Sequence, residues 1–86
     1  MEVEQEVKQK SLSKTEQNLL DALQIGNHPT IIKNVMLQPK AVALYDYIKG
    51  YEIMIQQRKT TNIKQFDMAR GLFRKLWPNS YISLLD

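Results

Sequence analysis

The sequence predicts an all-α fold, a small single-domain bundle of four or five helices around a long central helix at about 39–57. Two observations support this prediction. The longest apolar-rich stretch of the 86 residues repeats with the period of an α-helix. In addition, residues that typically begin or end helices separate the other apolar stretches. We assign residues 11–86 to this domain and residues 1–10 to a flexible, polar N-terminal arm.

The central helix begins at Pro39, a residue suited to the first turn of a helix. Its apolar residues form two adjacent stripes that together cover about half of its circumference. Other helices, or a partner, must cover so wide an apolar surface. The first stripe consists of Ala41, Leu44, Ile48, Tyr51 and Ile55, and the second of Ala43, Tyr47, Gly50 and Met54.

The region before the central helix predicts two shorter helices. Ser13 and Glu16 have the spacing of a capping box, so a helix is expected from about 14 to 25, with Gly26 as the left-handed residue that ends it. Pro29 fits the start of a short helix that reaches about Leu37. The isoleucines and valine of this segment also suit a strand, but no second strand of equal quality is apparent in the sequence, so we favour a helix.

After the central helix, residues 58–62 form a polar break, in which Thr61 or Asn62 can cap the next helix. That helix is expected from about 63 to 77, and Pro78 stops it. The last residues are expected to fold back as a short turn with a cap at Asn79 or Ser80.

The segment 66–78 has Phe66, Ala69 and Phe73 at helical spacing before Pro78. This pattern resembles the second helix of a tetratricopeptide hairpin. The resemblance covers roughly 30 residues, and it implies that Ala69 faces the long helix at a close crossing. The linker is longer than in that family, and the flanking repeats that such solenoids need are missing from the sequence.

Composition excludes several classes of function. The chain has no cysteine and one histidine, His28, which removes thiolate and His-rich metal sites, and it has no catalytic or nucleotide-binding motif. We therefore expect a non-enzymatic protein with no catalytic residue, cofactor or metal. The longest unbroken aliphatic run, at 41–44, has four residues, too few to span a membrane, and the N-terminus is acidic, unlike a signal peptide. A soluble, cytoplasmic protein is expected.

The central helix also carries apolar residues on the side that should face water. Together with one lysine they predict a surface for a protein partner or for self-association, because aromatic and aliphatic residues on a polar face indicate an interaction site. The main hypothesis is a protein-interaction module, a regulator or inhibitor from a small genome or a mobile element. The predicted partner-binding residues are Val42, Tyr45, Lys49 and Ile53.

The alternative hypothesis is a small protein that binds DNA or RNA. Residues 49–75 hold seven cations and two acidic residues, so a basic helix face there could follow a phosphate backbone. A solvated helix face explains the same charges without any ligand. The predicted nucleic-acid-binding residues are Arg58, Lys59, Lys64, Arg70, Arg74 and Lys75.

Overall fold

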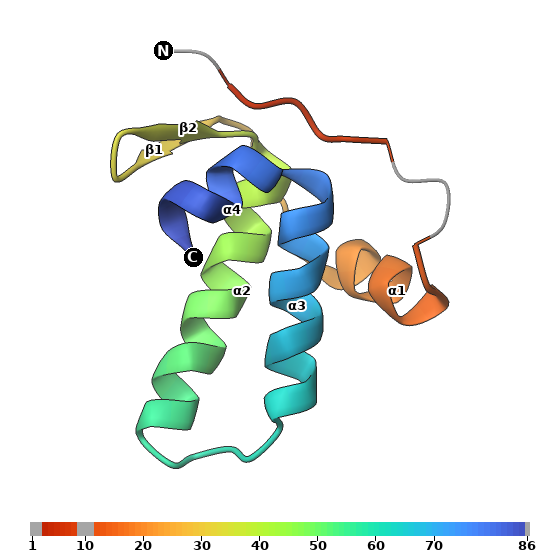
Figure 1. The fold of residues 1–86 in the computed structure, drawn as a ribbon, viewed down its shortest axis with the longest axis vertical. Helices are drawn as coiled ribbons and strands as arrows, with labels where there is room; N and C mark the ends of the chain where they lie inside the picture. Colours follow the sequence, from red (N-terminus) through yellow and green to blue (C-terminus); the bar gives the residue numbers. More distant parts are fainter. Residues whose placement is uncertain (1–2, 9–11, 86) are drawn as a thin grey trace.

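The computed structural model describes residues 3–8 and 12–85. Over these residues the chain forms four helices and one two-stranded sheet (Figure 1). The fold is mostly helical, as predicted, with a small sheet that the all-α prediction lacked. The helices are α1 (Lys14–Ala22), α2 (Pro39–Gln56), α3 (Ile63–Leu76) and α4 (Pro78–Leu84), and the strands are β1 (Thr30–Ile32) and β2 (Val35–Leu37).

Helices α2 and α3 run antiparallel, side by side, and form a long helical hairpin (Figure 1). Helix α4 and the β1–β2 sheet lie at one end of this hairpin, and α1 packs against α3. At the other end, at the bottom of Figure 1, α2 and α3 extend beyond every other element. The covering elements therefore lie over only part of the hairpin.

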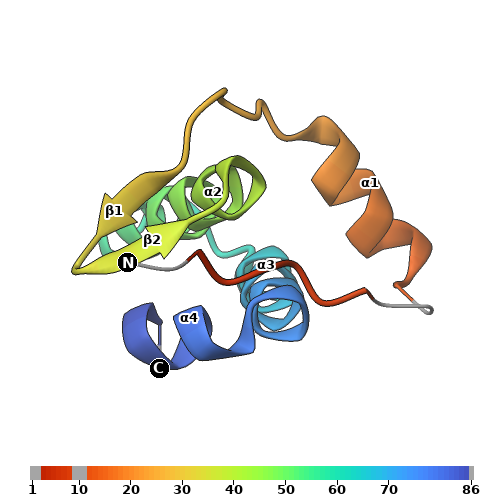
Figure 2. The same ribbon diagram turned by 90° about the horizontal axis from the view of Figure 1, so that it is seen from above.

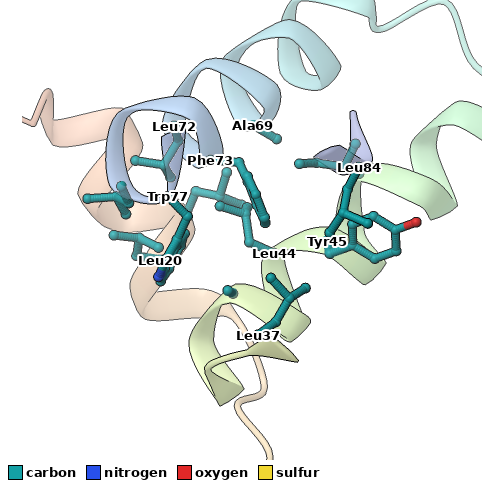
Figure 3. Packing of buried hydrophobic residues seen from close by; sticks show 13 residues of the cluster. Leu20, Leu37, Leu44, Tyr45, Ala69, Leu72, Phe73, Trp77 and Leu84 are labelled. Carbon is teal, nitrogen blue, oxygen red and sulfur yellow. The ribbon is translucent and has the colours of Figure 1, made fainter. Parts of the chain in front are cut away.

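The core lies at the covered end of the hairpin (Figure 3). Its largest side chains are Trp77 and Phe73, whose ring centroids are 5.5 Å apart. The indole N–H of Trp77 donates to the side-chain oxygen of Gln38 at 3.1 Å, which satisfies the one polar atom of the ring. The buried apolar residues come from all four helices, from β2 and from the α3–α4 junction: Leu19, Leu20, Leu37, Ala41, Leu44, Tyr45, Ile48, Ala69, Leu72, Phe73, Leu76, Trp77 and Leu84.

Three of the predicted helices are present with the predicted signals. The central helix ends at Gln56, one residue before its predicted end. The capping box of α1 is formed by reciprocal hydrogen bonds between Ser13 and Glu16 of 3.1 and 3.0 Å. Asn62 caps α3 by accepting the amide of Gln65 at 3.2 Å. Local hydrogen bonds that the sequence encodes therefore fix these helix starts.

The helix predicted at 29–37 is wrong, because this segment is the β1–β2 hairpin. The segment supplies its own second strand: Ile32 pairs with Val35 across the two-residue turn of Lys33 and Asn34. Both turn residues have positive φ, 47° and 67°, as a two-residue hairpin turn of type I′ requires. Asparagine tolerates this conformation, and the isoleucines and valine favour strands.

The predicted end of the first helix is also wrong. Helix α1 ends at Ala22, and Leu23 follows in an extended conformation with ψ of 141°. Leu23 packs against the core in this conformation, so the chain leaves the helix before Gly26. No glycine of the described residues has a positive φ, so Gly26 does not act as a left-handed cap.

The start of α4 has a different cap from the one predicted at Asn79 or Ser80. Trp77 is the N-cap residue, and its side chain makes no capping hydrogen bond. The carboxylate of Glu4 instead accepts hydrogen bonds from the backbone amides of Asn79 and Ser80. Glu4 belongs to the predicted flexible arm at 1–10, of which residues 1–2 and 9–10 lie outside the described residues. Residues 3–8 lie extended on the domain.

No helix among the described residues is both long and apolar enough to cross a membrane.

The hairpin turn predicts a stabilising double substitution, Lys33→Asn with Asn34→Gly. Asparagine and glycine accept positive φ more readily than lysine and asparagine, so the free energy of unfolding should rise by about 0.5–1 kcal/mol. Urea denaturation followed by the fluorescence of Trp77, the single tryptophan, measures this change. The control is Asp46→Gly in α2. Glycine within a helix should lower the free energy of unfolding by about 1 kcal/mol. A less stable double variant would contradict the hairpin.

Candidate functional site

The four residues predicted to bind a partner do not lie on one open surface. Tyr45 was expected to face water but is only 7% exposed, so this part of the prediction is wrong. The reason is α4, which folds back over α2: Tyr45 lies at the edge of the core, on the side of Leu84 (Figure 3). The ammonium group of Lys49 lies 5.7 Å from the centroid of the Tyr45 ring and further shields it. Tyr45 is therefore a core residue.

Val42 is half-buried and lines a groove of about 280 Å³ on the outer side of α2. The segment between α1 and β1 runs along this side of α2 (Figure 2) and contributes His28 to the groove, and α2 contributes Asp46. The lining of this groove therefore includes one imidazole and one carboxylate. No group of three His, Asp or Glu residues among the described residues could hold a metal ion.

Lys49 and Ile53 lie further along α2, where the helix leaves the core. The last buried residue of α2 is Ile48, and the first buried residue of α3 is Ala69. We call residues 49–65, which lie between these two positions, the distal hairpin. All of these residues are described and none of them is buried. Within it, Lys49 pairs with Glu52 at 3.3 Å, and Ile53 is 52% exposed.

The distal hairpin carries several apolar side chains in spite of its exposure. Ile63 at the start of α3 is 53% exposed, close to the value for Ile53. Three further apolar side chains there are only half-buried. Such a group of uncovered apolar residues at the end of a helical hairpin is typical of a contact surface. Its apolar members are Tyr51, Ile53, Met54, Ile55 and Ile63.

Two tyrosines mark the boundary between the core and the distal hairpin. The rings of Tyr47 and Tyr51 are tilted, with centroids 5.1 Å apart, and the hydroxyl of Tyr47 accepts a hydrogen bond from Gln65 at 2.9 Å. Burial and the neighbouring Tyr51 hydroxyl raise the pKa of Tyr47 above its ordinary value, although the bond from Gln65 acts in the opposite direction. Tyr47 therefore stays neutral and joins α2 to α3.

The predicted basic face is divided by the structure. Arg70 lies against the rings of Phe66 and Tyr81, at 5.4 and 5.8 Å, and donates to the carbonyl of Leu85 at 2.9 Å. Arg74 lies 6.0 Å from the Tyr81 ring. These two arginines hold α4 on α3. The three cations nearest the loop between α2 and α3 are exposed, namely Arg58, Lys59 and Lys64.

Lys75, the sixth predicted cation, pairs with Glu16 of α1. Its ammonium group contacts both carboxylate oxygens at 2.9 and 3.0 Å, and the Glu16 side chain is only 9% exposed. Burial acts to raise the pKa of Glu16, but hydrogen bonds from Ser13 and Lys75 outweigh it, so the pKa lies below its ordinary value. This ion pair attaches α1 to α3 and is structural.

Sequence reasoning missed the extent of the exposed part of α2. Tyr51, Ile55 and Met54 have core spacing, but α2 is longer than the elements that cover it, so these residues lie beyond the core. Ala69, placed at a close helix crossing by the tetratricopeptide resemblance, is fully buried. No family model, curated protein or solved structure matches the chain.

The Glu16–Lys75 pair predicts a pH-dependent effect of Lys75→Met. At pH 7 the substitution leaves a buried carboxylate without its cation and should lower the free energy of unfolding by about 1–2 kcal/mol. The folded-state pKa of Glu16 is lowered, so its stabilisation is present above about pH 4.5 and is lost as the pH falls through the folded value. The wild-type and variant curves should therefore converge in acid.

Urea denaturation between pH 3 and pH 8 measures this convergence. Lys64→Met, on the exposed side of the same helix, is the matched control and should change stability by about 0.5 kcal/mol or less. An unfolding free energy for Lys75→Met that stays parallel to wild type at every pH would show that the ion pair contributes nothing.

Proposed function

We propose that this protein is a small non-enzymatic interaction module that binds a larger protein through the distal hairpin. The observation that carries the proposal is the mismatch between helix length and core: the buried residues stop at Ile48 and resume at Ala69. Two helical segments project between them, with apolar side chains that the described residues leave exposed or half-buried. Lys49 and Ile53 of the predicted partner-binding set belong to this surface, and Val42 lies on the same side of α2.

The energetic argument rests on the uncovered side chains. Full burial of an isoleucine is worth about 1.5–3 kcal/mol, and Ile53 and Ile63 are each about half exposed, so each has on the order of 1 kcal/mol of unused burial. A single domain of this size is marginally stable and gains nothing from exposed isoleucines. A partner that covers the distal hairpin provides the missing burial.

The charges of the distal hairpin define the partner further. Residues 49–65 contain four cations and one acidic residue, and Lys49 already pairs with Glu52. The remaining cations are exposed around the apolar residues. Two copies of this surface would bring like charges together, which disfavours self-association. An acidic amphipathic helix fits both properties, because its apolar side would cover the isoleucines and its carboxylates would pair with Arg58, Lys59 and Lys64.

Nucleic-acid binding is the second candidate, favoured by the same three exposed cations. It has less support than in the sequence-based hypothesis because Arg70, Arg74 and Lys75 make contacts within the domain. The apolar residues beside the cations contribute nothing to a phosphate contact. For this candidate, the affinity for a fluorescent duplex or single strand must fall steeply with salt and be lost in Arg58/Lys59/Lys64→Ala.

The distal hairpin is tested by the double variant Ile53→Asp/Ile63→Asp. Buried carboxylates in the interface should weaken partner binding at least tenfold, whereas the domain should stay folded because both positions are exposed. The matched control is Ile82→Asp on α4, an isoleucine that is 63% exposed and outside the distal hairpin. The partner is captured from nuclease-treated lysate of the source cells, purified, and titrated against each variant by calorimetry.

Circular dichroism and the urea midpoint establish that all variants are folded. Equal affinities of wild type and the double variant would contradict the proposal, as would an equal loss in the Ile82→Asp control. Capture that disappears after nuclease treatment would favour the nucleic-acid candidate. A dimer in light scattering that the double variant abolishes would identify a second copy as the occupant, in place of the acidic helix.

A further inference from the structure

The N-terminal arm lies across the surface of the domain, well away from the distal hairpin. Residues 3–8 pass between β2 and α4 and across the C-terminal end of α3 (Figure 2). The arm passes beside core residues, since Leu37, Leu76 and Trp77 are at most 1% exposed with the arm in place. We call the domain residues that bond to the arm the arm site, namely Met36, Gln38, Lys40, Leu76, Asn79 and Ser80.

The arm site contacts two carboxylates of the arm that are two residues apart. The carboxylate oxygens of Glu4 accept the backbone amides of Ser80 at 2.7 Å and Asn79 at 3.0 Å. The carboxylate of Glu6 accepts a hydrogen bond from the ammonium group of Lys40 at 2.9 Å. These contacts are charge-assisted and select an acidic segment.

The backbone of the arm is recognised as an extended strand. Val3 forms a parallel bridge with Met36 of β2, which adds a third segment to the edge of the sheet. Four residues further along, the amide of Val7 donates to the carbonyl of Leu76 at 2.8 Å. Addition of a strand to an exposed sheet edge is a common mode of peptide recognition.

The arm is held without much burial. None of residues 3–8 is buried, Val7 is 41% exposed, and the side chains of the Lys40–Glu6 pair are 38% and 33% exposed. Segments with few apolar contacts and solvent-accessible hydrogen bonds open at a small cost in free energy. We therefore expect the arm to leave the arm site while the domain stays folded.

We propose that the arm site is a second binding site, which takes an extended acidic peptide of a partner protein after displacing the arm. The partner segment carries two carboxylates two residues apart, one for Lys40 and one for the amides of Asn79 and Ser80, and an amide that donates to Leu76. The arm occupies the site in cis and inhibits it. This site is independent of the distal hairpin and of the function proposed for it.

The test uses the full chain and a fluorescent peptide with the sequence of residues 1–8, MEVEQEVK, as the probe. The tethered arm competes at an effective concentration on the order of 1 mM, so wild type should bind the peptide poorly. Glu4→Gln/Glu6→Gln in the protein weakens the arm and should increase the apparent affinity at least tenfold in fluorescence anisotropy. Val7→Pro, which removes the donor to Leu76, releases the arm by a second route and should act in the same direction.

Three controls define the result. Lys8→Ala, an exposed residue of the same arm, should bind the peptide like wild type. Adding Lys40→Met to the released arm, or replacing both glutamates of the peptide by glutamine, should reverse the gain. Ile53→Asp should leave peptide binding unchanged. Equal binding by wild type and both released variants would overturn the proposal, as would a dimer formed by exchange of arms without peptide binding.

Discussion

The fold depends on the burial of Trp77 at the point where three helices and the arm meet. Trp77 ends α3, begins α4 and is fully buried. Its indole N–H bonds to Gln38, the residue that precedes α2, and the same Gln38 side chain donates to Gln5 of the arm at 2.9 Å. One side chain thus fixes the start of α2, the turn from α3 into α4, and the path of the arm. Because all these contacts gather at one end of the helical hairpin, the other end is left uncovered.

The remaining polar contacts attach elements to this centre from the outside. The Glu16–Lys75 pair holds α1 on α3, and Arg70 holds α4 through ring contacts and a carbonyl. Each of these cations has an aliphatic stem that covers apolar surface while its charged group reaches a partner. Charges that read as a single basic stripe in the sequence therefore have two physical roles. Those near the core connect helices, and those of the distal hairpin, such as Lys64, lie on its exposed surface.

The sequence correctly predicts the helix starts that local signals control. The predictions are wrong where tertiary contacts determine the structure. The capping box at Ser13, the cap at Asn62 and the start at Pro39 act within a few residues, and each was predicted correctly. The β-hairpin was missed because residues 29–37 were treated as one segment that needed a partner strand elsewhere. The turn of Lys33 and Asn34 lies within this segment and lets its two halves pair with each other. Tyr45 was misplaced because helical spacing gives directions around α2, and the position of α4 over that side depends on tertiary packing.

The same distinction explains why the candidate surfaces could be predicted only in part. Ile53 and Lys49 were recognised from their spacing in the sequence. The extent of the distal hairpin depends on how far the other elements reach along α2 and α3, which only the folded structure shows. The arm site was not foreseen, because the polar residues 1–10 carry no periodic signal. Its ligands are backbone amides of Asn79 and Ser80, and these groups exist in every sequence. Only the fold brings these amides within reach of Glu4. A binding surface made largely of backbone groups therefore has no sequence motif, and the segment that occupies it, here the chain's own arm, identifies it.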